Sequence, residues 1–206
     1  PGRSVLIPSP SFLLYRMWGR LTESQIADYR LVESGRRFDY PAGEIAALVR
    51  EQRPALTVLC LPNNPTGSEL EMRDLEGIVE AVESVGGWLL IDEAYREFSG
   101  PEFDRTRFSV DGNRVFLLRT FSKAFSAAGL RIGYLLTNSE GADAMLKIVP
   151  PFHLSLFNAV AGKVLWRRRE IFDERIELLL AERERVMNAL AGIRGLEVFA
   201  SSANFF

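Results

Sequence analysis

Residues 88–95 read Trp-Leu-Leu-Ile-Asp-Glu-Ala-Tyr, four apolar side chains followed at once by two carboxylic acids. A short apolar run without polar interruption is typical of a strand that is covered on both faces, as in a parallel sheet. The preceding residues, 69–85, have the apolar spacing of a helix, and Ser68 with Glu71 has the spacing of a capping box at its start. This region therefore predicts a helix, then a buried strand that ends in acids.

The same alternation extends in both directions along the chain. Further apolar runs stand at 5–7, 57–61, 115–118 and 132–136, and a second helical pattern covers 42–52. Alternating strands and helices favour an α/β fold with a mostly parallel sheet. The short segment between the last two strands has room for one turn of helix.

The character of the chain changes after residue 150. Residues 155–191 are helical in pattern and carry charges of both signs, which predicts one long helix or two in succession with a solvated face. Residues 195–199 predict the beginning of a new strand. We expect a partial large domain over 1–150, and connecting helices with the start of a small C-terminal domain over 151–206. The chain looks truncated at both ends.

Composition argues against several classes of protein. Of 206 residues, 47% are apolar and 25% charged, and the formal net charge is −2, so nucleic acid is not an expected partner. No membrane-spanning run and no signal-peptide pattern is present, so we expect a cytoplasmic protein without a membrane partner. The single cysteine, Cys60, cannot build a disulfide framework. A metal site is a weak alternative because His153 is the only histidine.

Lysine is rare in this chain. Of 25 basic residues, only Lys123, Lys147 and Lys163 are lysines. Only an amine can form a Schiff base, so a lysine in an arginine-rich chain is a candidate nucleophile. Lys123 stands between two predicted strands, with hydroxyl residues beside it and Arg131 eight residues later. Hydroxyls and an arginine suit a phosphate group, although a surface turn with incidental charges is the alternative.

Two more clusters follow predicted strands, where ligands of parallel sheets bind. Residues 63–67, Asn-Asn-Pro-Thr-Gly, form either a sharp turn or a loop whose asparagine amide reaches a ligand. Asp92 is either a helix N-cap or a partly buried acid that needs a cationic partner. Together the clusters supply an amine, a phosphate site, a carboxylate and hydrogen-bond donors, which are the requirements of pyridoxal 5'-phosphate (PLP).

In this order the motifs resemble the fold-type I PLP-dependent enzymes of the aminotransferase class I/II group. They are Asn-Pro-Thr-Gly at 64–67, Asp-Glu-Ala-Tyr at 92–95, Ser-Lys-Ala-Phe at 122–125 and Gly-Leu-Arg-Ile-Gly-Tyr at 129–134. Within the group they are most similar to the histidinol-phosphate aminotransferases, over about residues 8–206. The resemblance implies a PLP-transferase-like, three-layer large domain with a mostly parallel sheet, followed by the start of a smaller α+β domain.

The resemblance also assigns roles by position. Lys123 would bind the cofactor covalently and transfer the substrate's proton, and Asp92 would pair with the pyridine nitrogen. The other implied roles are hydrogen bonds to the phenolic oxygen from Asn64 and Tyr95, phosphate contacts from Thr120, Ser122 and Arg131, and ring stacking from Phe12. A core phenylalanine is the alternative for Phe12. His153 stands where the subgroup more often has asparagine, and is either a substrate contact or a structural histidine.

The activity that the resemblance implies is transfer of an amino group from histidinol phosphate to 2-oxoglutarate, by a homodimer in histidine biosynthesis. Three alternatives stay open. A related PLP enzyme such as a threonine-phosphate decarboxylase would use the same cofactor site, as would an aminotransferase for other amino acids. A non-catalytic regulator built on a PLP-enzyme domain is the third. The family's N-terminal arm, its upstream glycine-containing loop and its C-terminal arginine lie outside these residues.

Overall fold

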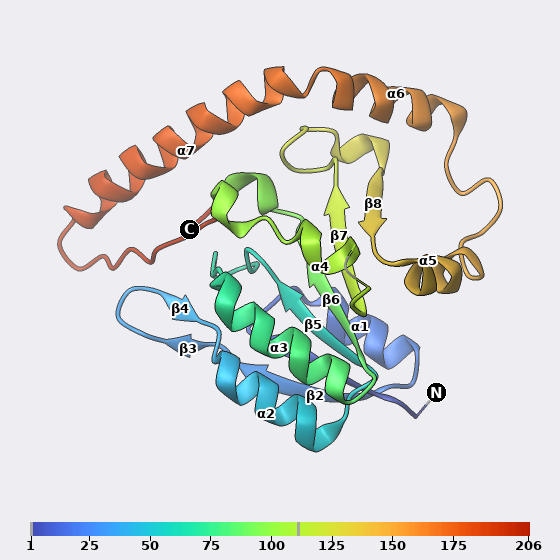
Figure 1. The fold of residues 1–206 in the computed structure, drawn as a ribbon. Helices are drawn as coiled ribbons and strands as arrows, with labels where there is room; N and C mark the ends of the chain where they lie inside the picture. Colours follow the sequence, from blue (N-terminus) through green and yellow to red (C-terminus); the bar gives the residue numbers. More distant parts are fainter. Residues whose placement is uncertain (1, 111) are drawn as a thin grey trace.

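The centre of the fold is a six-stranded sheet with the strand order β2-β1-β5-β6-β7-β8 (Figure 1). The structure, a computed structural model, describes residues 2–110 and 112–206. All neighbouring strands are parallel except β8, which runs antiparallel to β7. The mostly parallel sheet is therefore confirmed. The strands are β1 (Ser4–Ser9), β2 (Gln25–Arg30), β5 (Leu56–Cys60), β6 (Trp88–Asp92), β7 (Val115–Thr120) and β8 (Gly133–Leu136).

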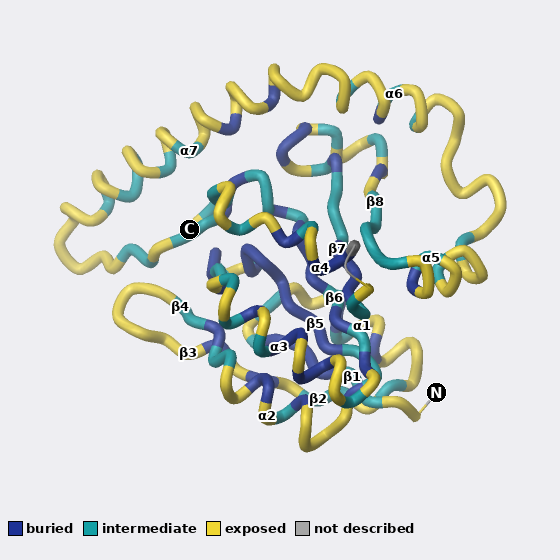
Figure 2. Tube along the Cα trace, in the orientation of Figure 1, coloured by how far each residue is buried: buried dark blue, intermediate teal, exposed yellow. Residues whose placement is uncertain are grey.

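Helices cover both faces of this sheet, which makes three layers. Helices α2 (Ala42–Gln52) and α3 (Met72–Ser84) pack on one face against alternate strand residues such as Leu59 and Ile91. Helix α1 (Leu14–Leu21) covers part of the other face, where Tyr15 packs against Val58 and Cys60. Because side chains of a strand alternate between faces, burial on both sides explains the uninterrupted apolar runs. Figure 2 shows these central strands as the most buried part of the molecule.

Two elements at the sheet's far edge were missing from the sequence-based prediction. Strand β2 contains Gln25, Asp28 and Arg30, because it lies at the edge and is exposed along part of its length. Helix α1 is only eight residues long, and Tyr15 and Gly19 are its buried residues. A separate short hairpin, β3 (Val32–Glu33) and β4 (Phe38–Asp39), follows β2.

The predicted capping box of α3 is wrong. The helix begins at Met72, with Glu71 at its N-cap and no side-chain cap hydrogen bond. The Ser68 hydroxyl instead lies 2.6 Å from the Thr66 hydroxyl, and the Ser68 carbonyl accepts the Asn63 N–H at 2.8 Å. Ser68 therefore closes the turn after β5, and the helix starts later than predicted.

The C-terminal part of the chain forms α5 (Ser139–Leu146), α6 (Leu156–Arg167) and α7 (Arg169–Ala191). The long helical region is thus two helices in succession, one of the two expected arrangements (Figure 1). Most of α7 is exposed, but Phe172 packs on Phe125, with ring centroids 5.2 Å apart. Within the described residues no helix combines the length and the apolar character needed to cross a membrane.

The strand predicted at 195–199 does not form. Phe199 stacks on Phe38 with ring centroids 5.4 Å apart, and the Ala200 N–H donates to the Arg36 carbonyl at 2.7 Å. These contacts attach the segment to the β3–β4 hairpin without a ladder of backbone hydrogen bonds. The remaining short elements are η1 (Arg96–Phe98), η2 (Pro101–Phe103), α4 (Thr106–Val110) and η3 (Ala128–Leu130), the last of which is the expected helical turn between β7 and β8.

Candidate active site

The carboxyl ends of β1, β5, β6 and β7 open onto a cavity of about 470 Å³. This is the edge at which parallel α/β sheets bind ligands, and the volume suits a small organic molecule. Every residue to which the sequence assigned a role in cofactor binding lines it. These residues are Phe12, Asn64, Asp92, Tyr95, Thr120, Ser122, Lys123 and Arg131.

Asp92 is the buried acid of this cavity, with 7% of its surface exposed. Its Oδ1 accepts the Ala94 N–H at 3.0 Å, and its Oδ2 accepts the Tyr15 hydroxyl at 2.7 Å. Burial raises the pKa of Asp92 above its ordinary value, and the hydrogen bonds from Tyr15 and Ala94 and the Lys123 charge only partly oppose this. A buried carboxylate with lone pairs to spare is a site for a cationic nitrogen. The helix N-cap alternative does not hold, because the residues after Asp92 form no α-helix.

Lys123 lies on the loop that follows β7. Phe121 and Phe125, whose ring centroids are 4.7 Å apart, anchor the loop in an aromatic cluster, whereas Lys123 between them is exposed. Its Nζ lies 5.0 Å from the centroid of the Tyr95 ring, over the ring face. The buried aromatic residues thus fix the loop in place, and the loop presents the Lys123 amine at the cavity.

Two hydroxyls and a guanidinium provide anion-binding groups in the same cavity. The Thr120 hydroxyl donates to Ser122 Oγ at 2.9 Å and accepts the Ser122 N–H at 3.0 Å, which ties the turn together. Arg131 has a left-handed backbone with φ 51°, and its Nη1 donates to the Ala128 carbonyl at 2.9 Å. Its other nitrogens remain available, and such groups bind phosphate with charge-assisted hydrogen bonds.

The two neighbouring asparagines have different positions. Asn63 is fully buried: its Oδ1 accepts the Ser11 hydroxyl at 2.6 Å, and its Nδ2 donates to the Pro10 carbonyl at 3.0 Å and to Thr66 Oγ1 at 2.7 Å. Asn63 therefore joins the turns after β1 and β5. Asn64 is partly exposed and lines the cavity, so its amide is the one that can reach a ligand.

His153 is remote from this arrangement. It is exposed, it does not line the cavity, and its Nδ1 lies 3.1 Å from the Pro150 carbonyl. In the part of the chain that the structure describes, no three His, Cys, Asp or Glu side chains gather as metal ligands would. The chemistry of the cavity is instead that of an amine, an acid and an anion site, and these residues fit PLP.

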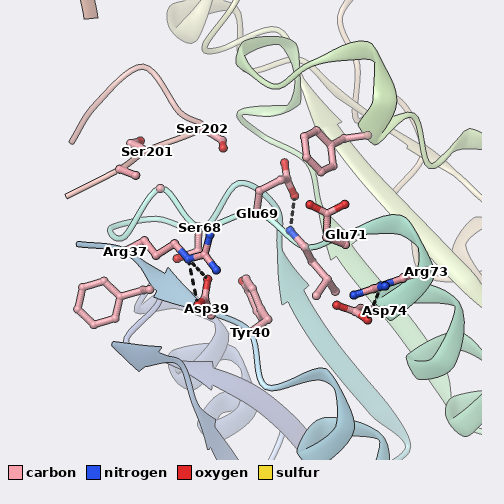
Figure 3. A pocket seen from close by; sticks show the side chains of 15 residues that line it. Arg37, Asp39, Tyr40, Ser68, Glu69, Glu71, Arg73, Asp74, Ser201 and Ser202 are labelled. Carbon is pink, nitrogen blue, oxygen red and sulfur yellow. Dashed lines mark hydrogen bonds and ion pairs between the residues drawn. The ribbon is translucent and has the colours of Figure 1, made fainter. Parts of the chain in front are cut away.

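A second cavity, of about 550 Å³, lies between the β3–β4 hairpin, the start of α3 and residues 200–202 (Figure 3). None of the predicted site residues lines it. Two ion pairs lie around it: Arg37 with Asp39 at 2.9 Å, and Arg73 with Asp74 at 3.5 Å. The smaller cavity at the strand ends is therefore the candidate active site.

Sequence reasoning missed two features around the site. Tyr15 reaches Asp92 from α1, and a signal for it existed: Phe12, Tyr15 and Trp18 recur every three residues, and all three line the cavity. The second feature is a buried ion-pair network centred on Glu93. Its Oε2 lies 2.7 Å from Arg119 Nε and its Oε1 lies 3.3 Å from Arg105 Nη1.

Comparison with known proteins matches the whole chain, residues 1–206, to the family model described as aminotransferase class I and II. Two curated relatives are named histidinol-phosphate aminotransferase. The one from Methylibium petroleiphilum is 37% identical over 205 residues, which are 99% of this chain and 53% of the relative. The one from Caldanaerobacter subterraneus subsp. tengcongensis is 36% identical, over 99% of this chain and 56% of the relative. The chain thus spans about half the length of these relatives.

Solved structures show the same fold. The histidinol-phosphate aminotransferase of Sinorhizobium meliloti, in complex with pyridoxal-5'-phosphate, superposes with a TM-score of 0.87 at 24% identity, over 98% of this chain and 54% of that one. The L-threonine-O-3-phosphate decarboxylase of Porphyromonas gingivalis superposes with a TM-score of 0.80 at 23% identity, over 98% of this chain and 58% of that one.

Proposed function

Because this chain belongs to the aminotransferase class I and II family, we propose that the protein is a PLP-dependent aminotransferase. The observation that carries the proposal is the meeting of a free lysine amine, a buried acid and an anion site in one cavity. When bound, PLP supplies an electron sink that stabilises negative charge on the α-carbon of an amino substrate.

The residues of the cavity have separate tasks in this proposal. The Lys123 amine would hold the cofactor through its aldehyde and, when free, would act as the base that removes the proton from the substrate α-carbon. The Asp92 carboxylate would accept a hydrogen bond from the pyridine nitrogen and would keep that nitrogen protonated. This pairing would give the buried Asp92 carboxylate a cationic hydrogen-bond partner.

The other residues orient the cofactor. Thr120, Ser122 and Arg131 hold the phosphate through hydroxyl and guanidinium donors. The Asn64 amide and the Tyr95 hydroxyl donate to the phenolic oxygen. The Phe12 ring, 39% exposed at the cavity, would stack on the pyridine ring. Rigid binding at these points places the Lys123 amine near the α-carbon of the substrate.

The names of the relatives support a specific reaction. We propose that an amino group moves from histidinol phosphate to 2-oxoglutarate, which gives imidazole acetol phosphate and glutamate. The donor carbon is oxidised by two electrons to a ketone, and the acceptor carbon is reduced by the same two electrons. We further propose a cytoplasmic homodimer, with residues 1–150 in the cofactor-binding domain and 151–206 as connecting helices and the start of a small domain.

A decarboxylase is the second candidate, because a threonine-phosphate decarboxylase has the same fold. Both reactions need a cofactor-binding lysine and an acid at the pyridine nitrogen, so Lys123 and Asp92 serve either. The two differ in the bond to the α-carbon that breaks: C–H in amino transfer, C–C in decarboxylation. Assaying the full-length protein for glutamate formation and for carbon dioxide release separates them, and carbon dioxide release without amino transfer would overturn our choice.

Borohydride reduction tests the cofactor assignment directly. The full-length protein is incubated with PLP and reduced, and its peptides are mapped by mass spectrometry. We expect a pyridoxyl adduct on Lys123 that disappears in Lys123→Ala and persists in the control Lys163→Ala, whose lysine lies on α6. An adduct on another lysine, or none, would contradict the proposed function.

A further inference from the structure

A buried tyrosine stands behind the acid of the candidate active site. Tyr15 lies on α1 and is 4% exposed, and its hydroxyl donates to Asp92 Oδ2 at 2.7 Å. The two residues are 77 positions apart, and α1 covers the face of the sheet opposite α2 and α3. Because alternate residues of β6 face opposite sides, Leu90 and Asp92 share the side on which Tyr15 packs.

The contact restrains the carboxylate of Asp92. The Ala94 N–H holds Oδ1 at 3.0 Å and the Tyr15 hydroxyl holds Oδ2 at 2.7 Å, so each oxygen has one donor among the described residues. A carboxylate oxygen accepts about two hydrogen bonds, which leaves further acceptor positions. With both oxygens engaged, rotation of the carboxylate would break a buried hydrogen bond, so these positions stay directed as the fold sets them.

Tyr15 is itself held firmly and stays a donor. Its ring packs with Ile7, Val58 and Cys60, and it meets the Phe12 ring edge-on, with centroids 5.8 Å apart. Burial raises the pKa of the Tyr15 hydroxyl far above its ordinary value, so it keeps its proton. Cys60 lies directly opposite Asp92 in the strand pairing, and burial raises the pKa of its thiol to about 12. The neutral hydroxyl of Tyr15 thus adds a donor to Asp92 without adding charge.

We propose that Tyr15 is a positioning residue, whose hydroxyl holds the Asp92 carboxylate oriented to receive a protonated pyridine nitrogen. The inference rests on the proposed function, because that nitrogen belongs to the cofactor. Tyr15 acts through Asp92 and not through the phosphate or the aldehyde. The effect of Tyr15 on cofactor affinity should therefore depend on the ring nitrogen. A purely structural role of Tyr15 would affect ligands with and without that nitrogen equally.

The chain offers a matched control in Tyr29. It is 1% exposed, and its hydroxyl donates to the Val58 carbonyl at 2.7 Å. Tyr29→Phe removes a buried hydroxyl from the same sheet but leaves Asp92 untouched. Loss of stability alone would therefore affect Tyr29→Phe and Tyr15→Phe alike.

The test measures the affinity of full-length apoprotein for PLP and for the analogue in which carbon replaces the ring nitrogen. Tyr15→Phe is expected to raise the Kd for PLP about tenfold, the size of one hydrogen bond to a charged group, and to leave the Kd for the carbon analogue within about twofold. Tyr29→Phe is expected to change neither Kd. Equal weakening for both ligands in Tyr15→Phe, or no weakening for either, would overturn the inference.

A second set of variants covers the case in which Tyr15→Phe perturbs the fold. In an Asp92→Asn background the carboxylate is gone, so Tyr15→Phe should add little further loss of PLP affinity; an unchanged tenfold loss there would rule out action through Asp92. The wild-type protein separates the two proposals. If it binds PLP on Lys123 and the variants behave alike, only the inference about Tyr15 fails; if it binds no PLP, the proposed function fails.

Discussion

Glu93 Oε2 lies 2.7 Å from Arg119 Nε, and this ion pair joins the carboxyl ends of β6 and β7 beside the candidate active site. Glu93 is fully buried, as is Arg105, which contacts its other oxygen and also pairs with Glu69. The network lies one residue from Asp92 and one from Thr120, on the opposite side of β6 from Tyr15. The acid of the site is therefore braced from both faces of the sheet.

Breaking this network should destabilise the protein strongly. Glu93→Gln keeps the shape of the side chain but leaves two largely buried guanidinium groups without their shared carboxylate. We expect the free energy of unfolding to fall by about 3 kcal/mol, measured by urea denaturation. The exposed Glu182→Gln, which loses only a surface pair with Arg185, should cause no measurable change. Equal stability of the two variants would contradict the bracing role.

The adjacent asparagines should separate stability from binding. Asn63→Ala removes a fully buried amide that makes three hydrogen bonds, so the free energy of unfolding should fall by about 2 to 3 kcal/mol. Asn64→Ala should change stability by less than about 0.5 kcal/mol and weaken PLP binding instead. Urea denaturation and PLP titration of both variants check this. If Asn64→Ala lost stability and Asn63→Ala lost only PLP affinity, Asn64 would be the structural residue and Asn63 the ligand contact.

Replacing the nucleophile should abolish turnover without removing the charge. Lys123→Arg keeps a cation at the cavity, but a guanidinium neither forms the bond to the cofactor nor acts as the base. We expect kcat of the full-length enzyme to fall by about a thousandfold or more. Lys147→Arg, at the end of α5, is the control and should keep full activity. Turnover that survives in Lys123→Arg would show that Lys123 is neither the cofactor-binding amine nor the base.

In the apoprotein, the ionised form of Asp92 should lower the free energy of unfolding, because the carboxylate is buried. Its pKa is raised by burial and by Glu93, while Tyr15, Ala94 and the Lys123 charge act in the opposite direction. The folded state therefore holds a proton that the unfolded state has lost, so the contribution of Asp92 to stability falls as the pH rises from the ordinary aspartate pKa of about 4 through the raised one.

Asp92→Asn, which has no such proton, should show this difference directly. We expect the variant to match the wild-type apoprotein at low pH and to be the more stable of the two above the raised pKa, while it binds PLP more weakly. Urea denaturation at several pH values is the measurement. A wild-type apoprotein that gains stability relative to Asp92→Asn as the pH rises would show that the carboxylate is already well compensated.

Local sequence was a good guide where burial is uniform. The strands β5 and β6 could be predicted because both faces of each are covered, so nearly every side chain is apolar. The local sequence was a poor guide at the edge strand β2. There Gln25 and Asp28 interrupt the apolar pattern, because these positions of the strand are exposed to solvent. The spacing of Ser68 and Glu71 also misled, because a hydroxyl that could cap a helix bonds to Thr66 instead.

The amino-acid sequence by itself determined the sheet's main strands, the helices between them and the residues that would meet at the strand ends. Each of these follows from neighbours a few positions apart, whose spacing repeats the geometry of a strand, a helix or a turn. Only the tertiary structure decided that Tyr15 reaches Asp92, that Asn64 and not Asn63 faces the cavity, and that Glu93 is paired. Those contacts depend on strand order and on which face each side chain takes, and they join residues up to 77 positions apart that no local pattern relates.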